Sequence, residues 1–279
     1  MTQAIQSLHD IADQFDAIVL DQWGVLHDGS APYPLAIETL RALKTKGVRL
    51  AVLSNSGKRS APNANRITAM GFDADLFETV MTSGEALWRD IAAQRLAYTS
   101  LYPITRAHGD AQGWAKGLDI TLTDDLAQAD AVLLMGLPDG AGADDFAQIL
   151  SDAKTRGLPM LCTNPDRASP RADGVVVLSP GALAHDYQDR GGDTRFYGKP
   201  HQPVFTAIAE TLQTDRLLMV GDSLEHDIAG GHGAGWSTLF IQGGLHASAF
   251  RSGDVIQTIH DLARKDTAPL PTYTLTRLS

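Results

Sequence analysis

The chain has 279 residues, of which 43% are hydrophobic and 20% are charged, so its composition is that of a folded globular protein rather than a disordered chain or a coiled coil. The formal net charge of −10 disfavours nucleic acid or an anionic membrane as a partner, so a bound phosphate would need a metal ion or backbone amides beside it. The single cysteine, Cys162, excludes an internal disulfide framework and a cysteine-based zinc site.

Short apolar runs, several of them rich in β-branched residues, predict the strands. These runs are residues 17–20, 48–53, 131–135, 160–162, 175–178, 217–220 and 238–241. Several are apolar throughout rather than alternating with polar residues, which is typical of parallel strands covered by helices on both faces.

Helical patterns lie between these runs. Apolar residues at helical spacing mark residues 35–43, 146–153 and 204–212, and Gly47 follows the first of these stretches. The alternation of strand and helix predicts an α/β protein with a doubly wound, mainly parallel sheet. Residues 267–279 carry two prolines and are expected to form a loosely attached end.

Polar residues that directly follow the apolar runs are candidates for a site, because ligands of such sheets bind beyond the carboxyl ends of the strands. Asp21, Ser54 and Asp222 occupy such positions. Asp227 follows in the sequence GDSLEHDIAGG, and it can face the same site as Asp222 if Asp222 lies on the strand-end loop and Asp227 in the next helix. Lys199 precedes the helix predicted over residues 204–212, in the sequence YGKP.

Carboxylates, an ammonium and a hydroxyl are the groups that phosphoryl transfer through a magnesium-bound phosphate requires. Each residue also has a purely structural interpretation, since Asp21 could end a strand, Ser54 could belong to a turn and Lys199 could lie on the surface. The occurrence of all these residues in one order favours the catalytic interpretation.

In this order the motifs resemble those of the haloacid dehalogenase (HAD) superfamily. The interval between Ser54 and Lys199 has room for a large inserted cap. Within it, CTNPDRASP (residues 162–170) and LSPGALA (residues 178–184) resemble the cap of the class IIA branch, which includes nitrophenyl phosphatase-like, nucleotide and sugar phosphatases. The resemblance covers nearly the whole chain.

The resemblance implies two domains. A HAD-like Rossmannoid core would comprise residues 1–83 and 187–279, and a C2-type α/β cap that selects the substrate would comprise residues 84–186. A homodimer formed through the cap is expected on the same basis. The polar, acidic and amphipathic residues 1–16 are not a signal peptide, and no apolar run approaches the ~20 residues that span a bilayer, so we expect a cytoplasmic protein.

The resemblance also implies a role for each candidate residue. Asp21 would be the nucleophile and a metal ligand, with the backbone carbonyl of Trp23 as a second ligand. Asp222 would bind Mg²⁺ directly and Asp227 through water, while Lys199 would pair with Asp21 and the phosphate. The residues expected to contact the substrate or its phosphate are Trp23, Gly24, Ser54, Asn55, Lys199, Asn164 and Asp166.

One position departs from the family pattern. Phosphatases of this superfamily have a second aspartate two residues after the nucleophile, which protonates the leaving oxygen and then activates water. This chain has Trp23 there, and an indole can donate one hydrogen bond but cannot shuttle a proton at neutral pH. His27 and Asp28 lie on the same loop and are the predicted substitutes.

Together these observations predict Mg²⁺-dependent hydrolysis of a small phosphorylated metabolite, for example a sugar phosphate, through an aspartyl-phosphate intermediate and with low activity. One alternative is a phosphate-ligand binding protein that has lost useful turnover because of Trp23. The other is a phosphotransferase in which an acceptor hydroxyl, instead of water, discharges Asp21.

Overall fold

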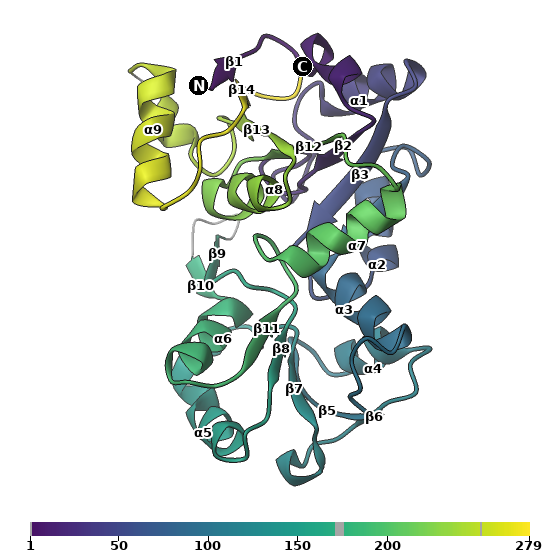
Figure 1. The fold of residues 1–279 in the computed structure, drawn as a ribbon, viewed down its shortest axis with the longest axis vertical. Coiled ribbons are helices and arrows are strands. Elements are labelled where there is room, and N and C mark those ends of the chain that lie inside the picture. The colour runs from purple at the N-terminus through teal and green to yellow at the C-terminus, as the bar shows by residue number, and fades with distance from the viewer. Residues whose placement is uncertain (1, 171–175, 252) are drawn as a thin grey trace. The chain divides into compact units, whose positions relative to one another are not determined.

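The computed structural model of the protein describes residues 2–170, 176–251 and 253–279, and the chain separates into two compact units (Figure 1). The first unit comprises residues 1–54, 63–81 and 199–279, and the second comprises residues 55–62 and 82–198. The first unit is therefore built from segments on both sides of the second in the sequence.

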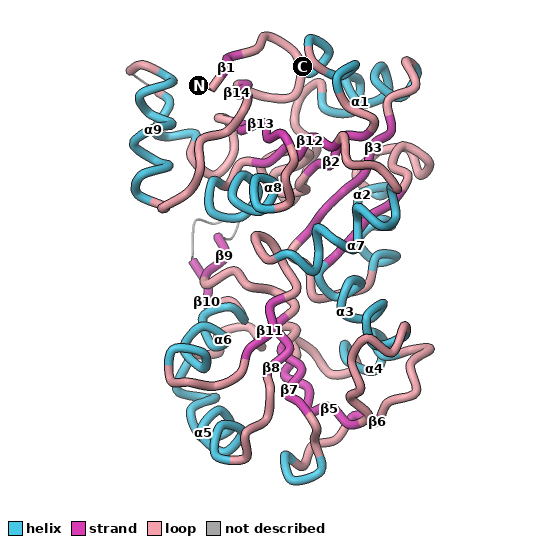
Figure 2. Tube along the Cα trace, in the orientation of Figure 1, coloured by secondary structure: helices cyan, strands magenta, loops and turns pink. Residues whose placement is uncertain are grey.

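A seven-stranded sheet forms the centre of the first unit (Figure 2). Its order is β1-β14-β13-β12-β2-β3-β4, and all pairings from β1 to β3 are parallel. The strands are β1 (Gln3–Ala4), β2 (Ala17–Leu20), β3 (Arg49–Ser54), β4 (Thr79–Thr82), β12 (Leu217–Gly221), β13 (Ser237–Ile241) and β14 (Tyr273–Leu275). The neighbours β2 and β12 are buried at every position, which explains why their sequences are apolar throughout.

Helices cover both faces of this sheet. They are α1 (Ala36–Thr45), α2 (Ser60–Ala69), α7 (Gln202–Leu212), α8 (Ala229–Gly233) and α9 (Val255–Lys265). On one face, Leu40 of α1 belongs to the same buried cluster as Leu239 of β13. On the other face, Phe240 of β13 packs with Ile259 of α9, because successive strand residues point to opposite faces. The predicted doubly wound α/β core is confirmed.

The C-terminal segment differs from the expectation of a loosely attached end. Strand β14 lies inside the sheet between β1 and β13, and Leu275 and Leu278 are 3% and 2% exposed. The backbone amide of Leu8 donates to the carbonyl of Ser279, so a hydrogen bond connects the N-terminal and C-terminal segments. The expectation was wrong because the strand pairing of residues 273–275 stabilises a segment whose own composition predicts a loop.

A five-stranded parallel sheet of order β11-β8-β7-β5-β6 forms the centre of the second unit. Its strands are β5 (Ser100–Ile104), β6 (Thr121–Leu122), β7 (Ala131–Leu134), β8 (Met160–Cys162) and β11 (Thr194–Phe196). Its helices are α3 (Ser83–Ala92), α4 (Asp110–Ala115), α5 (Ala147–Thr155) and α6 (Pro180–Asp189). Across the residues that the structure describes, no helix is both long enough and apolar enough to cross a membrane.

Two details of this unit differ from the sequence-based boundaries. Strand β11 pairs with β8, so residues 194–196, which were predicted to belong to the core, complete the sheet of the second unit. The strand predicted at residues 175–178 is β10 (Val176–Leu178), which pairs antiparallel with β9 (Ala168–Pro170) instead of joining the parallel sheet. Residue 175 lies outside the described residues.

Candidate active site

The carboxyl edge of the large sheet gathers the polar residues that follow its central strands. Asp21 directly follows β2, Asp222 directly follows β12, and these two strands are neighbours. Ser54 ends β3, which pairs with β2 on its other side. Because the strands are parallel, all three side chains start from the same edge of the sheet.

Asp21, Asp222 and Asp227 form an acidic cluster at this edge. Each contributes a carboxylate oxygen, and these oxygens all lie within 4.8 Å of one another. Asp227 reaches the cluster from the π-helical turn Leu224–Ile228, where its Oδ2 accepts a hydrogen bond from the Ser223 amide (3.1 Å). The turn therefore brings a residue five positions after Asp222 back to the same site.

Lys199 is the cation that pairs with this cluster. Its Nζ donates to Oδ1 of Asp21 and to Oδ1 of Asp227, both at 2.6 Å, and its side chain is only 3% exposed. Burial lowers the pKa of an ammonium, but the two carboxylates outweigh burial and hold the pKa of Lys199 above its ordinary value. Lys199 is therefore charged at neutral pH and neutralises one of the three carboxylates.

The remaining negative charge fits a divalent cation. Burial raises the pKa of the Asp21 carboxyl to about 6, with Lys199 opposing the rise and Asp227 adding to it. Burial, followed by repulsion from Asp21 and Asp227, raises the pKa of Asp222 well above its ordinary value. Burial and, after it, mutual repulsion disfavour the charged forms of these carboxyls, and a cation among them would offset that cost. Three carboxylates are oxygen ligands of the kind that Mg²⁺ prefers.

The loop after Asp21 approaches the cluster closely at Gly24. Gly24 has a φ of 77°, and a Cβ at this position would lie 1.7 Å from Oδ2 of Asp222. Only glycine allows both the left-handed backbone and the contact. The predicted involvement of Gly24 thus has a steric basis, since its backbone forms one wall of the acidic cluster.

The Trp23 side chain turns toward its own loop. A Cβ on Gly29 would lie 2.1 Å from Cη2 of the indole, so the ring lies directly over Gly29. The ring also makes an edge contact with His27 (centroids 5.8 Å apart), and the guanidinium of Arg66 lies 5.7 Å from its centroid. Trp23 is nevertheless 42% exposed, so part of the indole faces solvent.

His27 and Asp28, the predicted acid and base substitutes, are engaged with backbone amides of this loop. The Gly29 amide donates to Nδ1 of His27 (3.0 Å), which assigns the ring proton to Nε2. Burial and the charge of Arg66 lower the pKa of His27 to about 4. The carboxylate of Asp28 accepts the amides of Ser30 and Ala31, which lower its pKa. Both side chains stabilise the loop, and their proposed proton transfer gains no support from these contacts.

Three of the predicted substrate contacts belong to the second unit. Asn164 Oδ1 accepts the amide of Asp166 (3.0 Å), which is the turn expected around Pro165. Asp166 Oδ1 in turn accepts a hydrogen bond from Nδ2 of Asn55 (2.7 Å). Asn55 therefore belongs with Asn164 and Asp166, although Ser54, its neighbour in sequence, belongs to the first unit.

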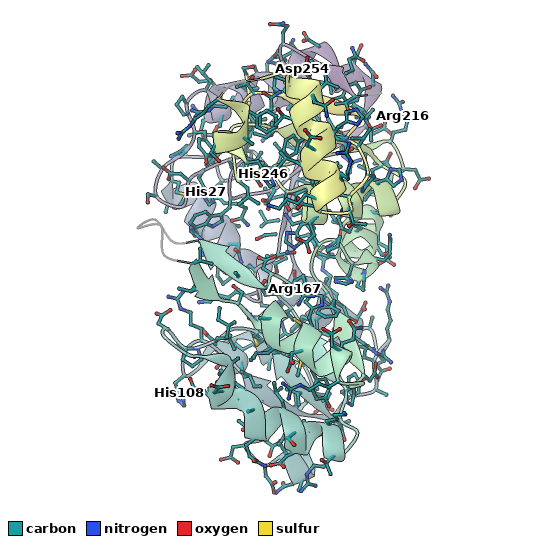
Figure 3. All side chains as sticks on the ribbon, turned by 90° about the vertical axis from the view of Figure 1, so that its left-hand side faces the viewer. His27, His108, Arg167, Arg216, His246 and Asp254 are labelled. Carbon is teal, nitrogen blue, oxygen red and sulfur yellow. The ribbon has the colours of Figure 1, made fainter. Side chains whose placement is uncertain are left out.

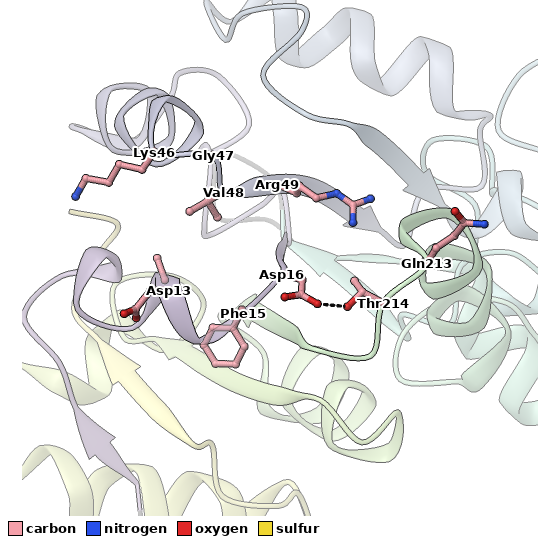
Figure 4. A pocket seen from close by; sticks show the side chains of 10 residues that line it. Asp13, Phe15, Asp16, Lys46, Gly47, Val48, Arg49, Gln213 and Thr214 are labelled. Atoms are coloured by element: carbon pink, nitrogen blue, oxygen red, sulfur yellow. Dashed lines mark hydrogen bonds between the residues drawn. The ribbon is translucent and has the colours of Figure 1, made fainter.

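A hollow of about 540 Å³ lies at the opposite edge of the large sheet (Figure 4). Asp16, which directly precedes β2, and Arg49, the first residue of β3, line it, and the hydroxyl of Thr214 donates to Asp16 (2.6 Å). Its lining contains no member of the acidic cluster. The candidate active site is therefore the carboxyl edge rather than this hollow.

Sequence reasoning missed a second loop that contacts Asp222, the loop that follows strand β13. The backbone amide of Leu245 donates to Oδ2 of Asp222 (2.6 Å), and a Cβ on Gly244 would lie 2.1 Å from the same oxygen. The paired glycines Gly243 and Gly244, which begin two residues after the end of the 238–241 run, were the available signal. They follow strand β13 at the same carboxyl edge.

Comparisons with known proteins agree with this architecture. A haloacid dehalogenase-like hydrolase model matches residues 18–111, and a HAD-hydrolase-like model matches residues 196–264. These two ranges contain Lys199 and every member of the acidic cluster. Chronophin from Mus musculus is 26% identical over 247 residues, which cover 86% of this chain and 85% of that protein.

Two solved structures share the fold. A haloacid dehalogenase-like hydrolase from Brucella suis 1330 is 27% identical with a TM-score of 0.82, over 99% of this chain and 100% of that one. Glycerol phosphate phosphatase from Mycobacterium tuberculosis, in complex with magnesium, is 24% identical with a TM-score of 0.70, over 93% of this chain and 80% of that one. With its motifs, its sheet and both family models in agreement, the chain belongs to the haloacid dehalogenase-like hydrolases.

Proposed function

We propose that this chain is a magnesium-dependent phosphatase that acts on a small organic phosphate through an aspartyl-phosphate intermediate. The observation that carries the proposal is the acidic cluster with Lys199 buried among its carboxylates. The similarity to a glycerol phosphate phosphatase solved with magnesium supports the reaction class and the metal.

In this proposal a carboxylate oxygen of Asp21 attacks phosphorus, and the bond from phosphorus to the leaving oxygen breaks. The hydroxyl of Ser54 donates to a phosphoryl oxygen, and Lys199 neutralises charge on the transferring group. Asp21, Asp222 and the Trp23 carbonyl would hold Mg²⁺, with Asp227 acting through water. When bound, Mg²⁺ supplies the positive charge that phosphoryl transfer needs at this site. Water then attacks the phosphorus of the aspartyl phosphate and regenerates the carboxylate.

Protonation of the leaving oxygen is the step of this reaction to which no acid is assigned. The indole of Trp23 cannot act as a general acid at neutral pH, and the contacts of His27 and Asp28 hold both side chains in their own loop. General acid help is worth about 10²–10⁴-fold, so esters with a basic leaving group are expected to react slowly. An activated ester such as p-nitrophenyl phosphate needs less of this help.

The Trp23→Asp variant tests this point. We expect it to raise turnover of glycerol 3-phosphate by about 10-fold or more, within the range of general acid catalysis, and to change p-nitrophenyl phosphate turnover less. Trp23→Phe is the matched control, because it removes the indole without supplying a carboxyl group. Unchanged or lower turnover of glycerol 3-phosphate by Trp23→Asp would count against the assignment.

Phosphate release from a panel of phosphorylated metabolites, with and without Mg²⁺, tests the function itself. We expect release that needs the metal and is lost in Asp21→Asn. Binding of phosphorylated compounds without any release would favour the binding-protein alternative. Faster discharge in the presence of an alcohol, with formation of a new phosphate ester, would favour the phosphotransferase.

The second unit is proposed to act as the substrate-selecting cap and to join two copies of the chain. The Asn55–Asp166 hydrogen bond supports a shared role for the residues predicted to face substrate in this unit. Light scattering of the whole chain and of a variant with charged substitutions on this unit would test the homodimer. A monomer at every concentration would contradict it.

A further inference from the structure

The last residues of the chain hold an arginine against the loop that contacts Asp222 of the acidic cluster. The amide of Gly243 donates to the carbonyl of Thr276 (2.9 Å), and Leu278 is 2% exposed. Arg277 lies between these two anchors, so its backbone is fixed even though its side chain is exposed. This placement depends on the strand pairing of the C-terminal segment.

Two neighbouring glycines relate Arg277 to the cluster. A Cβ on Gly243 would lie 2.9 Å from Nε of Arg277, and a Cβ on Gly244 would lie 2.1 Å from Oδ2 of Asp222. Consecutive Cα atoms are only about 3.8 Å apart. The arginine and the Asp222 carboxylate therefore contact adjacent residues of one loop.

Tyr33 completes the arrangement. The guanidinium carbon of Arg277 lies 5.7 Å from the centroid of the Tyr33 ring, within the range of a cation–π contact. The amide of Tyr33 donates to the carbonyl of Leu26 (2.9 Å), which fixes the ring to the loop that follows Asp21. Burial, and then the charges of Asp222 and Asp28, raise the pKa of the Tyr33 phenol, which remains a neutral hydroxyl.

Arg277 differs in its partners from three exposed arginines of this unit, whereas Arg66 also lies over an aromatic ring, that of Trp23. Arg41, Arg49 and Arg216 each pair with a carboxylate. In the described ranges of the chain, Arg277 makes no ion pair. A guanidinium beside an aromatic ring and open to solvent suits a carboxylate or a phosphate, which it can bind through two parallel hydrogen bonds.

We propose that Arg277 and Tyr33 form a second anion subsite beside the acidic cluster, which binds a carboxylate or phosphate of the substrate other than the phosphoryl group that is removed. The inference rests on the proposed phosphatase function, because that function accounts for the phosphoryl group that is removed. It narrows the substrate class to small organic phosphates that carry a second anionic group. A chain with a net charge of −10 needs such a local cation to hold a polyanion.

Two substrate pairs test the subsite. Glycerol 3-phosphate and 3-phosphoglycerate differ by a carboxylate, and fructose 6-phosphate and fructose 1,6-bisphosphate differ by a phosphate. We expect Arg277→Gln to reduce the ratio of kcat/KM for the member with the second anionic group to that for the member without it by about 10- to 100-fold in one pair, which identifies the second group. A ratio unchanged in both pairs would overturn the proposal.

Arg216→Gln is the matched control, because Arg216 is also exposed but directly precedes β12, at the amino edge of the sheet. Figure 3 shows Arg216 and His27 on opposite sides of this unit. We expect this variant to leave both ratios unchanged. An equal loss in the two arginine variants would mean that any exposed cation has the effect, and would also overturn the proposal.

Binding to the Asp21→Asn chain separates this inference from the proposed function. Calorimetry with the same four compounds gives affinity ratios that do not require turnover. If wild-type protein releases phosphate neither from these four compounds nor from the metabolite panel, the proposed function fails, while a 10- to 100-fold fall of one affinity ratio on adding Arg277→Gln would still support the subsite. Affinity ratios that stay unchanged would overturn the subsite, whether or not the enzyme is active.

Discussion

Replacing Lys199 by methionine tests how the acidic cluster is held together. The side chain is 3% exposed, and its Nζ lies 2.6 Å from a carboxylate oxygen of both Asp21 and Asp227. Methionine keeps most of the volume but removes the charge and both hydrogen bonds. Three carboxylates whose oxygens lie within 4.8 Å of one another then remain without a protein cation.

The size of the effect follows from burial. Removing one partner of a buried ion pair costs about 3–5 kcal/mol, because the other charge stays buried without compensation. One lysine serves two carboxylates here, so we expect the upper part of this range. For a chain of this length about 1 kcal/mol shifts Tm by 2–4 °C, so a loss of about 4–5 kcal/mol should lower Tm by roughly 8–20 °C in metal-free buffer.

Thermal unfolding with EDTA and then with excess Mg²⁺ measures the effect. We expect Mg²⁺ to restore part of the loss, because a cation bound only by the folded chain stabilises it. Lys265→Met is the control, since Lys265 is an exposed residue at the end of α9. A Tm of Lys199→Met within about 2 °C of the wild-type value in metal-free buffer would refute the reasoning.

Three further predictions concern the loop, the second unit and the C-terminal segment. Gly24→Ala would place a Cβ 1.7 Å from Oδ2 of Asp222, and it should lower kcat/KM for p-nitrophenyl phosphate by about 100-fold. A loss smaller than about 10-fold would contradict the close packing of Gly24 against Asp222. In the second unit, burial alone would raise the pKa of Glu85, but the hydrogen bond from Arg59 (2.6 Å) contributes to holding this pKa below its ordinary value of 4.5. The stability that this group contributes is thus present above pH 4.5 and is lost as the pH falls through the lower pKa of the folded state. Glu85→Gln should therefore reduce the fall of the urea midpoint of unfolding on the acid side of its pH profile. An unchanged fall would contradict this prediction. Leu278→Ala should cost about 2–4 kcal/mol in urea unfolding, against less than about 1 kcal/mol for Leu270→Ala at a 38% exposed position, and equal costs would contradict the anchoring of the C-terminal segment.

The positions of Asp21 and Asp222 could be predicted because they depend on a local rule. A carboxylate that directly follows an apolar strand lies at the carboxyl edge of the sheet, and parallel neighbouring strands bring such side chains together. That β2 and β12 are direct neighbours is a finding of the structure, since the sequence analysis predicted no strand order. Asp227 required one additional assumption, a helical turn directly after Asp222.

The C-terminal segment could not be predicted in the same way. Residues 273–275 are Tyr, Thr and Leu, a stretch too short to mark a strand by its own pattern. They form a strand by pairing with β1 and β13, and β1 lies near the other end of the sequence. The contact between Tyr33 and Arg277 depends on this pairing, since the two residues are far apart in the chain. Likewise β11 belongs to the second unit because of its register with β8, which its own sequence does not encode.

Charge balance connects Trp23 with the proposed second subsite. Three carboxylates and Lys199 leave two formal negative charges at the cluster, which one divalent cation balances. An aspartate at position 23 would supply the missing acid, but it would also add negative charge where a phosphate must approach. With Trp23 in its place, a substrate with a second anionic group meets less repulsion, and Arg277 provides the attraction that such a group needs. The residue that removes the proton donor therefore also makes the site more suitable for a polyanion, and we expect both effects to appear in one variant: Trp23→Asp should speed turnover of glycerol 3-phosphate while weakening the binding of 3-phosphoglycerate.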